Sequence, residues 1–212
     1  MPVFKAGPGQ APEWCELERF DVLRLPVGSS TVFDREGERE KLIVVRGACT
    51  VALSDEVAVE AVADEILDID APGDRFGILG VTEDAIVVRM AGRWGDEVGG
   101  SGVFTVSVSA DPQDCGDPVD YPKTTSFDNH FHDCDEYWIV VEGSGVAVTE
   151  GKSFEVGPGD CVATGMGWHH DFPVAREPVV AVYFETTMEG GKRGGHLWEH
   201  THGPAEPKPE RQ

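Results

Sequence analysis

Several features are scarce in this sequence of 212 residues. It has five cysteines, an odd number, and no C-x-x-C pair, so it indicates neither a disulfide framework nor a thiolate zinc site. No apolar run approaches the roughly 18 residues that a membrane span needs. The first residues also lack the apolar core of a secretory signal. We therefore expect a cytoplasmic protein with no membrane partner.

Basic residues are also few. Lys and Arg total 17 against 39 Asp and Glu, which gives a net charge of −22. Such a surface repels phosphate backbones, so nucleic acid is not an expected partner. A hydrophobic content of 40%, with ten Phe and five Trp, indicates a globular chain with a packed core. The expected partner is therefore a small-molecule ligand.

Short apolar runs, broken by Gly, Pro and Asp, are the main pattern along the chain. They are β-branched and too short for amphipathic helices, so they are typical of strands. Many such runs predict an all-β sandwich or barrel with few or no helices. The one stretch with a helical pattern is residues 11–20, where Glu-rich positions surround Trp14 and Leu17. The runs are residues 42–45, 57–59, 85–88, 103–108, 138–141, 145–148 and 179–184.

A weak internal repeat divides the chain. Residues 40–47 align with residues 136–143 as a Glu, six residues typical of a strand, and a Gly, and the Pro-Gly-Asp of residues 72–74 matches that of residues 158–160. Two related β domains explain this repeat. The predicted segments are an N-terminal segment 1–19, a first barrel 20–92, a Gly-rich linker 93–102, a second barrel 103–187 and a tail 188–212.

All seven histidines follow residue 129. The alternation of an extended chain points His130 and His132 to one face. Glu136 follows a short acidic turn and begins the next predicted strand, and the pair His169 and His170 follows a Gly-rich turn. Imidazoles together with one carboxylate are ligands that suit divalent transition metals. The second half of the chain is therefore predicted to carry a metal site.

At these residues the sequence resembles the cupin superfamily. The first cupin motif is H-x-H, three or four residues, E, six residues and G. This chain matches it at His130, His132, Glu136 and Gly143.

The second cupin motif is G, five residues, P-x-G-x-x-H, three residues and N. Gly159, Gly167 and His170 match it, while Gly165 stands in place of the Pro and Val174 in place of the Asn. The Pro and the Asn are structural in the family, so their replacement loosens the turn and removes no ligand. The spacing from Gly167 selects His170 rather than His169.

The resemblance implies two tandem cupin (jelly-roll) barrels, of which the first is degenerate. It also implies one divalent transition metal in the second barrel: Fe, Mn, Ni, Zn or Co. Cupin-like chains often pair through strand edges, so a homodimer is compatible with the prediction. The implied metal ligands are His130, His132, Glu136 and His170.

Aromatic and sulfur side chains near these ligands are candidates for a substrate pocket. Alternation from Glu136 sets Trp138 beside the metal as a pocket wall. The full set of pocket candidates is Trp138, Met166, Trp168, Phe172 and Tyr183.

The fold leaves the reaction open. One hypothesis is a metal-dependent enzyme, isomerase- or epimerase-like or dioxygenase-like, that acts on a polar, oxygen-rich small molecule such as a sugar, sugar acid or keto acid. The alternative is a non-catalytic cupin that binds a small molecule with its metal and pocket.

Two further regions carry groups whose role stays open. In the first copy, carboxylates replace the histidines and could hold calcium or magnesium, or could face water in a decayed barrel. The tail histidines could form a second ion site, cover a barrel mouth, or be solvated beside a docked Leu197 and Trp198. The groups are Asp34, Glu36, Glu40 and Asp84 in the first copy and His196, His200 and His202 in the tail.

Overall fold

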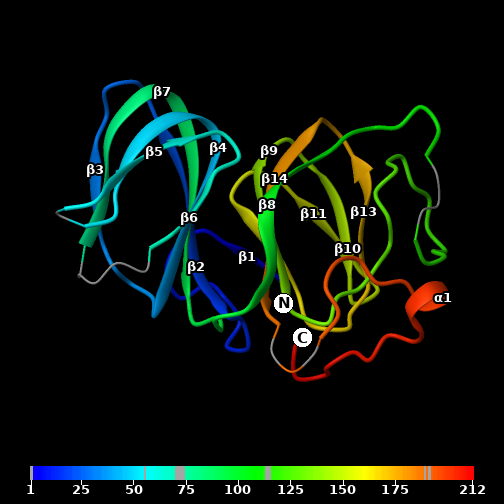
Figure 1. Cartoon of the computed structure of the whole chain (residues 1–212). Helices are drawn as coiled ribbons and strands as arrows, with labels where there is room; N and C mark the ends of the chain where they lie inside the picture. The colour runs from blue at the N-terminus through cyan, green and yellow to red at the C-terminus, as the bar shows by residue number, and fades with distance from the viewer. Residues whose placement is uncertain (1, 55, 70–74, 113–115, 189, 191) are drawn as a thin grey trace. The chain divides into compact units, whose positions relative to one another are not determined.

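The structure is a computed structural model that describes residues 2–54, 56–69, 75–112, 116–188, 190 and 192–212. It is almost entirely β, as the short apolar runs predict, with one short helix (Figure 1). The elements are β1 Val3–Lys5, β2 Leu17–Leu25, β3 Thr31–Asp34, β4 Arg39–Ala52, β5 Ala58–Val62, β6 Ile66–Asp68, β7 Arg75–Gly92, β8 Val98–Val106, β9 Glu136–Glu142, β10 Gly145–Thr149, β11 Lys152–Val156, β12 Asp160–Thr164, β13 His170–Ala175, β14 Val179–Thr187 and α1 Glu199–His202.

The helical pattern over residues 11–20 gave a wrong prediction. Leu17 begins β2 instead, and β2 pairs with β7 along its length. Leu17 and Phe20 are fully buried, so pairing and burial outweigh the local pattern. No helix among the described residues has the length and hydropathy to cross a membrane.

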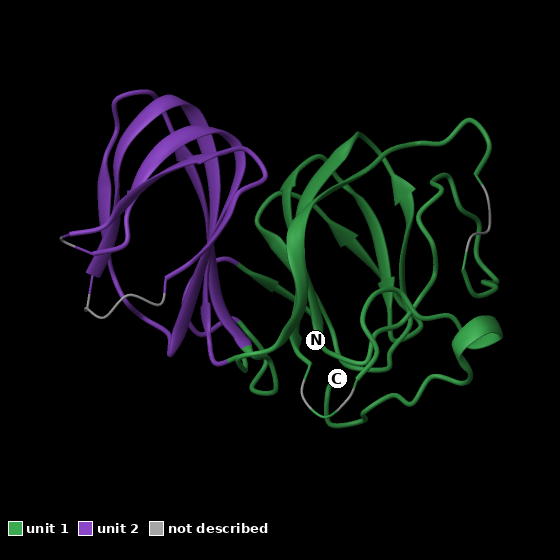
Figure 2. Cartoon of the chain, in the orientation of Figure 1, with its two compact units in different colours: residues 1–5, 11–16, 94–212 green, residues 6–10, 17–93 purple. Residues whose placement is uncertain are grey.

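The chain forms two compact units, shown in two colours in Figure 2. Unit 2 contains residues 6–10 and 17–93 and one six-stranded sheet in the order β2-β7-β4-β5, with β3 on β7 and β6 on β4. The long strands β4 and β7 shift register at several points, which bends the sheet around its own core. That core is built from residues such as Leu42, Val51, Ile78 and Val87.

Unit 1 contains residues 1–5, 11–16 and 94–212. A five-stranded sheet in the order β1-β12-β9-β14-β8 accompanies a three-stranded sheet in the order β11-β10-β13. Side chains from both sheets form one apolar cluster, as in a jelly roll. The cluster contains Val106, Trp138, Val140, Ala147, Val156, Val162, Phe172, Ala175, Val179 and Ala181.

The units differ from the predicted segments at the linker and at both ends of the chain. The Gly-rich stretch predicted as a linker contains the start of β8, which pairs with β14 at the edge of the larger sheet. Gly99 and Gly102 are small there because a Cβ would lie 2.6 Å from the Glu185 carboxylate and 2.9 Å from the Tyr183 ring. Residues 1–5 also belong to unit 1, because β1 pairs with β12.

The repeat glycine has the same physical basis in both units. Gly47 and Gly143 adopt φ of +80° and +76°, a region that side chains rarely adopt. A Cβ at either position would also collide with a carbonyl of the chain alongside, at Asp84 and Pro178 respectively. The other mark in the first copy, residues 71–74, lies outside the described residues.

Candidate metal centre

Three segments of unit 1 bring the predicted ligands together. His130 and His132 lie just before β9, Glu136 begins β9, and His170 begins β13. An antiparallel bridge joins His130 to His170 through two backbone hydrogen bonds of 3.2 and 2.9 Å. All four side chains are buried, and one potential ligand atom from each lies within 4.8 Å of the others.

The inner atoms of the cluster are close together. His170 Nε2 lies 2.7 Å and His132 Nε2 lies 3.3 Å from Glu136 Oε2. The Nε2 atoms of His130 and His132 are 3.1 Å apart. Each imidazole therefore directs the same nitrogen toward one point.

The outer nitrogens fix the protonation of the rings. Nδ1 of His130 lies 2.9 Å from the Asp128 carbonyl oxygen, and Nδ1 of His132 and His170 lies 3.0 and 3.1 Å from the carbonyl oxygens of Gly195 and Trp168. A carbonyl oxygen only accepts, so each neutral ring carries its proton on Nδ1. Each Nε2 then presents a lone pair to the centre, the tautomer that metal-binding histidines use.

This arrangement fits a cation. Three nitrogen lone pairs and a carboxylate converge. Without an ion between them, these electron-rich groups would only repel one another. Among the described residues, Glu136 Oε2 and His170 Nε2 have no hydrogen-bond partner although both are buried. A bound divalent metal would satisfy both atoms. The four residues thus form a candidate metal site.

The electrostatics favour the metal-binding state of His130, His170 and Glu136. Burial, together with the nearby His170, lowers the pKa of His130 to about 3, so this ring stays neutral. Burial alone would raise the pKa of Glu136, but the nearby imidazoles of His132 and His170 hold it well below its usual range. Burial alone would lower the pKa of His132, but the Glu136 carboxylate raises it, so a metal would have to displace any proton that His132 binds. Neutral imidazoles and an ionised carboxylate are the metal-binding forms.

A pocket of about 340 Å³ opens beside Glu136. Trp138 and Tyr183, both predicted as pocket residues, line it. Aromatic rings pack along its wall, with Phe104 centred 5.7 Å from Trp138 and 5.8 Å from Phe127. The lining is Phe104, Phe127, Glu136, Trp138, Tyr183, Glu185 and His196.

His196 brings the C-terminal tail into this site. Its ring stacks on His130 with the centroids 3.6 Å apart and the planes 4° from parallel. Its Nδ1 lies 2.9 Å from Asp128 Oδ2, which also accepts a hydrogen bond of 3.0 Å from the Trp198 indole. The histidine-rich tail pattern was the signal for this residue, but sequence reasoning left its role open.

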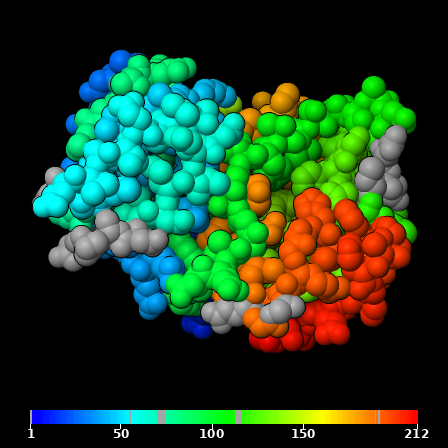
Figure 3. Space-filling view, viewed as in Figure 1, coloured from blue at the N-terminus to red at the C-terminus, as the bar shows by residue number. Residues whose placement is uncertain are grey.

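The tail continues around unit 1 and reaches the turn before His170. We call residues 193–211 the C-terminal segment; it forms the red and red-orange surface at the lower right of Figure 3. Leu197, which is buried, pairs with Phe131, and the backbone of Lys208 donates to Met166. Cβ atoms at Gly165 and Gly167 would collide with the backbones of Arg211 and Glu206. The glycine in place of the motif's proline therefore makes room for this segment.

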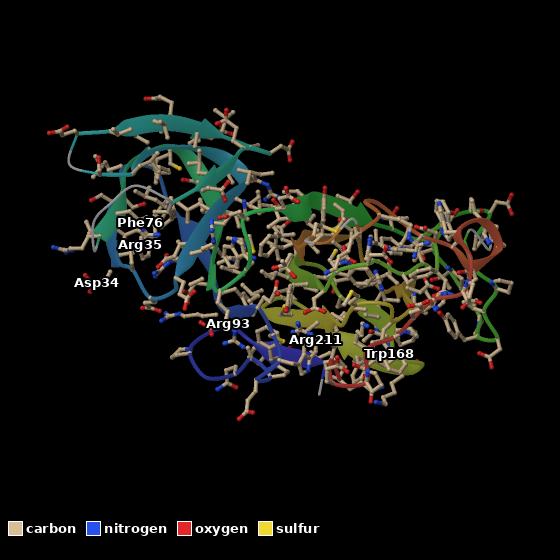
Figure 4. All side chains as sticks on the ribbon, turned by 60° about the horizontal axis from the view of Figure 1, so that its bottom comes forward. Asp34, Arg35, Phe76, Arg93, Trp168 and Arg211 are labelled. Carbon is tan, nitrogen blue, oxygen red and sulfur yellow. The ribbon has the colours of Figure 1, made fainter. Side chains whose placement is uncertain are left out.

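The remaining predicted pocket residues lie elsewhere. Met166 and Trp168 contact the C-terminal segment, and the Trp168 indole donates a hydrogen bond to the Lys208 carbonyl. Figure 4 labels Trp168 and Arg211 in this part of unit 1. Phe172 is fully buried in the core cluster. His169 turns away from the cluster to Asp117, with 2.8 Å between Nε2 and the carboxylate.

In unit 2 an arginine lies where the repeat would place a metal. Glu40, the counterpart of Glu136, forms a buried two-point ion pair with Arg89 at 2.9 and 3.1 Å. The Arg89 guanidinium also packs over the rings of Phe33 and Phe76, the latter labelled in Figure 4. The four carboxylates considered for calcium or magnesium form no ligand group in the described part of unit 2.

Comparisons with known proteins agree with this fold. Residues 119–186 match the cupin domain family. The uncharacterized protein y4oW of Sinorhizobium fredii (strain NBRC 101917 / NGR234) is 46% identical over 211 residues, covering 100% of this chain and 96% of that protein.

Two solved structures share the fold at low sequence identity. Oxalate decarboxylase of Bacillus subtilis, with Mn(II) centres, is 10% identical with a TM-score of 0.53, covering 82% of this chain and 70% of that one. AerE from Microcystis aeruginosa is 10% identical with a TM-score of 0.54, covering 79% and 86% respectively. The chain therefore belongs to the cupin superfamily, in one family with y4oW, as a two-domain protein whose C-terminal cupin carries a candidate metal site.

Proposed function

We propose that this protein is a metal-dependent enzyme whose C-terminal cupin acts on a polar, oxygen-rich small molecule. The observation that carries the proposal is the convergence of three imidazole Nε2 atoms and one carboxylate beside an open pocket. His130, His132, Glu136 and His170 would hold one divalent transition metal. Four protein ligands leave one or two positions of a five- or six-coordinate ion for the substrate.

The donor set is compatible with Mn, Fe, Co, Ni or Zn. A bound ion would polarise substrate oxygens as a Lewis acid. The Mn(II) centres of the B. subtilis oxalate decarboxylase make manganese a natural first metal to test.

Proton transfer is the chemistry that the pocket residues favour. Asp128 holds Nδ1 of His196, which leaves Nε2 as the nitrogen able to take or return a proton on the pocket side. Phe104, Phe127 and Trp138 restrict water at the same wall. We therefore favour an isomerase- or epimerase-like reaction.

A dioxygenase-like reaction is the second candidate. The aromatic wall supports it, because an apolar pocket admits molecular oxygen, and the same four ligands suit iron. This reaction needs a redox-active metal and consumes oxygen, whereas isomerisation needs neither.

Metal analysis with two activity measurements tests the proposal. We expect about one ion per purified chain, lost in Glu136→Ala and His170→Asn and kept in the matched control His169→Asn. A metal that stays in Glu136→Ala would contradict the ligand assignment.

The reaction is then distinguished with dihydroxyacetone as a probe hydroxy ketone. Metal-dependent exchange of its carbon-bound hydrogen for deuterium in D₂O supports proton transfer. Oxygen uptake by the iron-loaded protein supports the dioxygenase. A loaded protein that binds the probe without either reaction would support the non-catalytic alternative.

A further inference from the structure

Glu185 is a second carboxyl group beside the candidate metal site. It lies on β14 directly opposite Glu136 on β9, so the two side chains share one face of the sheet. Glu185 lines the same pocket and is 7% exposed. The described residues provide no hydrogen bond or ion pair to its carboxyl oxygens.

A buried carboxyl group without a partner is costly, and most proteins avoid it. In this chain the neighbouring strand makes room for it. A Cβ at Gly99 would lie 2.6 Å from Glu185 Oε2, so glycine at this position of β8 leaves the carboxyl its place. We take the space left by Gly99 as a sign that the Glu185 carboxyl oxygens accept hydrogen bonds from a ligand.

Two basic side chains of unit 1, Lys123 and Arg193, are engaged away from this pocket. Lys123 pairs with Asp171 at 2.8 Å, and Arg193 pairs with Asp133 at 2.8 Å. Among the described residues, no Lys or Arg lines the pocket. His196 is the basic side chain of the lining, and it is paired with Asp128 at 2.9 Å, so a second negative charge on a ligand would depend on the metal for neutralisation.

We propose that Glu185 binds the substrate directly and selects an uncharged or cationic molecule that offers it a hydroxyl or amine donor. This inference rests on the proposed function, and it narrows the substrate class. A sugar or amino alcohol fits, with oxygens at the metal and a donor at Glu185. A dianion such as oxalate is disfavoured by like-charge repulsion. The rings of Trp138 and Tyr183 supply the apolar wall for the carbon skeleton of the sugar or amino alcohol.

The test measures ligand affinity in the full-length, Mn(II)-loaded protein at pH 8. Oxalate and dihydroxyacetone are titrated, and binding is followed through the relaxation of water protons by the bound Mn(II). The variant is Glu185→Gln, and the matched control is Glu155→Gln, which removes one exposed carboxylate of the same unit.

We expect Glu185→Gln to bind oxalate at least about tenfold more tightly than the native protein, because a like charge has gone. Glu155→Gln should behave as native. The affinity for dihydroxyacetone should change by less than about threefold in Glu185→Gln, since the amide oxygen still accepts a hydrogen bond. The same affinity should weaken by about tenfold in Glu185→Leu.

Equal oxalate affinity in native protein and Glu185→Gln would overturn this inference alone. If Glu185→Gln does not fold, the oxalate affinity of Glu185→Leu answers the same question. A native protein that holds no stoichiometric Mn(II) would overturn the proposed function and this inference with it. Metal content is therefore measured first, so that the two failures are distinguished.

Discussion

His132 shows how one side chain serves both the fold and the candidate metal site. Its Nδ1–H donates to the Gly195 carbonyl in the C-terminal segment, and its Nε2 faces Glu136. The first contact fixes the ring orientation and the tautomer on which the second depends. The affinity for a metal is therefore set partly by a carbonyl 63 residues away in the sequence.

The neutral state of His130 predicts a pH dependence for the metal-free protein. Burial lowers the pKa of the folded His130 to about 3, whereas the unfolded side chain titrates near 6.5. As the pH falls below about 6.5, the unfolded state binds a proton that the folded state refuses, so stability falls by up to about 1.4 kcal/mol per pH unit until about pH 3. Urea unfolding at several pH values measures this slope. His130→Asn should have a shallower slope, and identical slopes would contradict the prediction.

The buried pair in unit 2 predicts a large effect of a single change. Arg89→Met leaves the Glu40 carboxylate buried without a partner, which should lower the free energy of unfolding by about 3–5 kcal/mol. The double variant Glu40→Gln with Arg89→Met removes the stranded charge and should recover most of the loss. Chemical denaturation of the three proteins gives both values. A double variant no more stable than Arg89→Met would contradict this account.

The residue scale also shows what sequence reasoning can reach. The four ligands were predictable because histidines with one glutamate at cupin spacing are rare outside metal sites. Glu185 and Arg89 carried no such signal. Glu185 is the one charged residue of β14, and Arg89 lies in an apolar stretch of β7. Only strand pairing places Glu185 opposite Glu136, and Arg89 opposite Leu42, two residues from Glu40.

At the scale of elements, β8 shows how a strand can be built for its neighbour. Its glycines lie against the pocket side chains of β14, so this part of the strand contributes space, whereas Phe104 further along contributes a pocket wall. This is the physical reason why a Gly-rich sequence that reads as a linker forms the edge of a sheet.

Two glycines of β8 predict contrasting effects of the same substitution. Gly102→Ala places a Cβ 2.9 Å from the Tyr183 ring and should destabilise unit 1 by about 1–3 kcal/mol. At Gly100 the nearest atom is 3.5 Å away, an ordinary contact, so Gly100→Ala should change stability by less than about 0.5 kcal/mol. Thermal unfolding of both variants measures the difference, and equal effects would contradict the role given to Gly102.

We expect Gly165, in the turn before His170, to be needed for holding the C-terminal segment in place. Gly165→Ala would push a Cβ into the Arg211 backbone, which has no flexible end to yield. We expect faster amide hydrogen exchange at Lys208 and Arg211, whose N–H groups are bonded in the native protein. Gly194→Ala is the control, because nothing lies within 4 Å of its Cβ. Unchanged exchange in Gly165→Ala would show that the segment does not depend on this glycine.

At the scale of the whole molecule, two related units neutralise the same glutamate in two ways. Unit 2 uses the Arg89 guanidinium, and we propose that unit 1 uses a metal. The positive charge of Arg89 is part of the chain, whereas the positive charge of a metal must be bound from solution. The stability of the two units should therefore respond differently to the metal supply.

This difference predicts how the full chain responds to metal removal. A metal at about 100 times its Kd adds about 2.7 kcal/mol to the stability of the unit that binds it. Chelation should therefore lower the melting temperature of the native protein and leave His132→Ala unchanged. Arg89→Met should respond to the chelator as the native protein does, because its defect lies in unit 2. A response of His132→Ala equal to the native one would contradict the metal assignment.

The pattern of short runs was enough to predict an all-β chain, and the internal repeat was enough to predict two related domains. The segment boundaries needed the structure, because β1 and residues 11–16 belong to a unit made mostly of residues after 93. The hydrophobic periodicity of a strand contains no information about a pairing partner so distant in the sequence. For the C-terminal segment, docking of Leu197 and Trp198 was among the alternatives that the sequence left open. The backbone hydrogen bonds of its polar residues have no hydrophobic pattern that would have placed it further.

The pairing of β1 with β12 has a consequence for synthesis on the ribosome. Val3 pairs with Val162, so 162 − 3 = 159 residues separate partners at the edge of one sheet. Unit 2 is fully translated by residue 93, while β1 still waits for its partner. Gly195, which holds His132, and Arg211, which reaches Asp135, are translated later than β12. The candidate metal site therefore cannot be completed until the C-terminal segment has emerged, long after unit 2 has been translated.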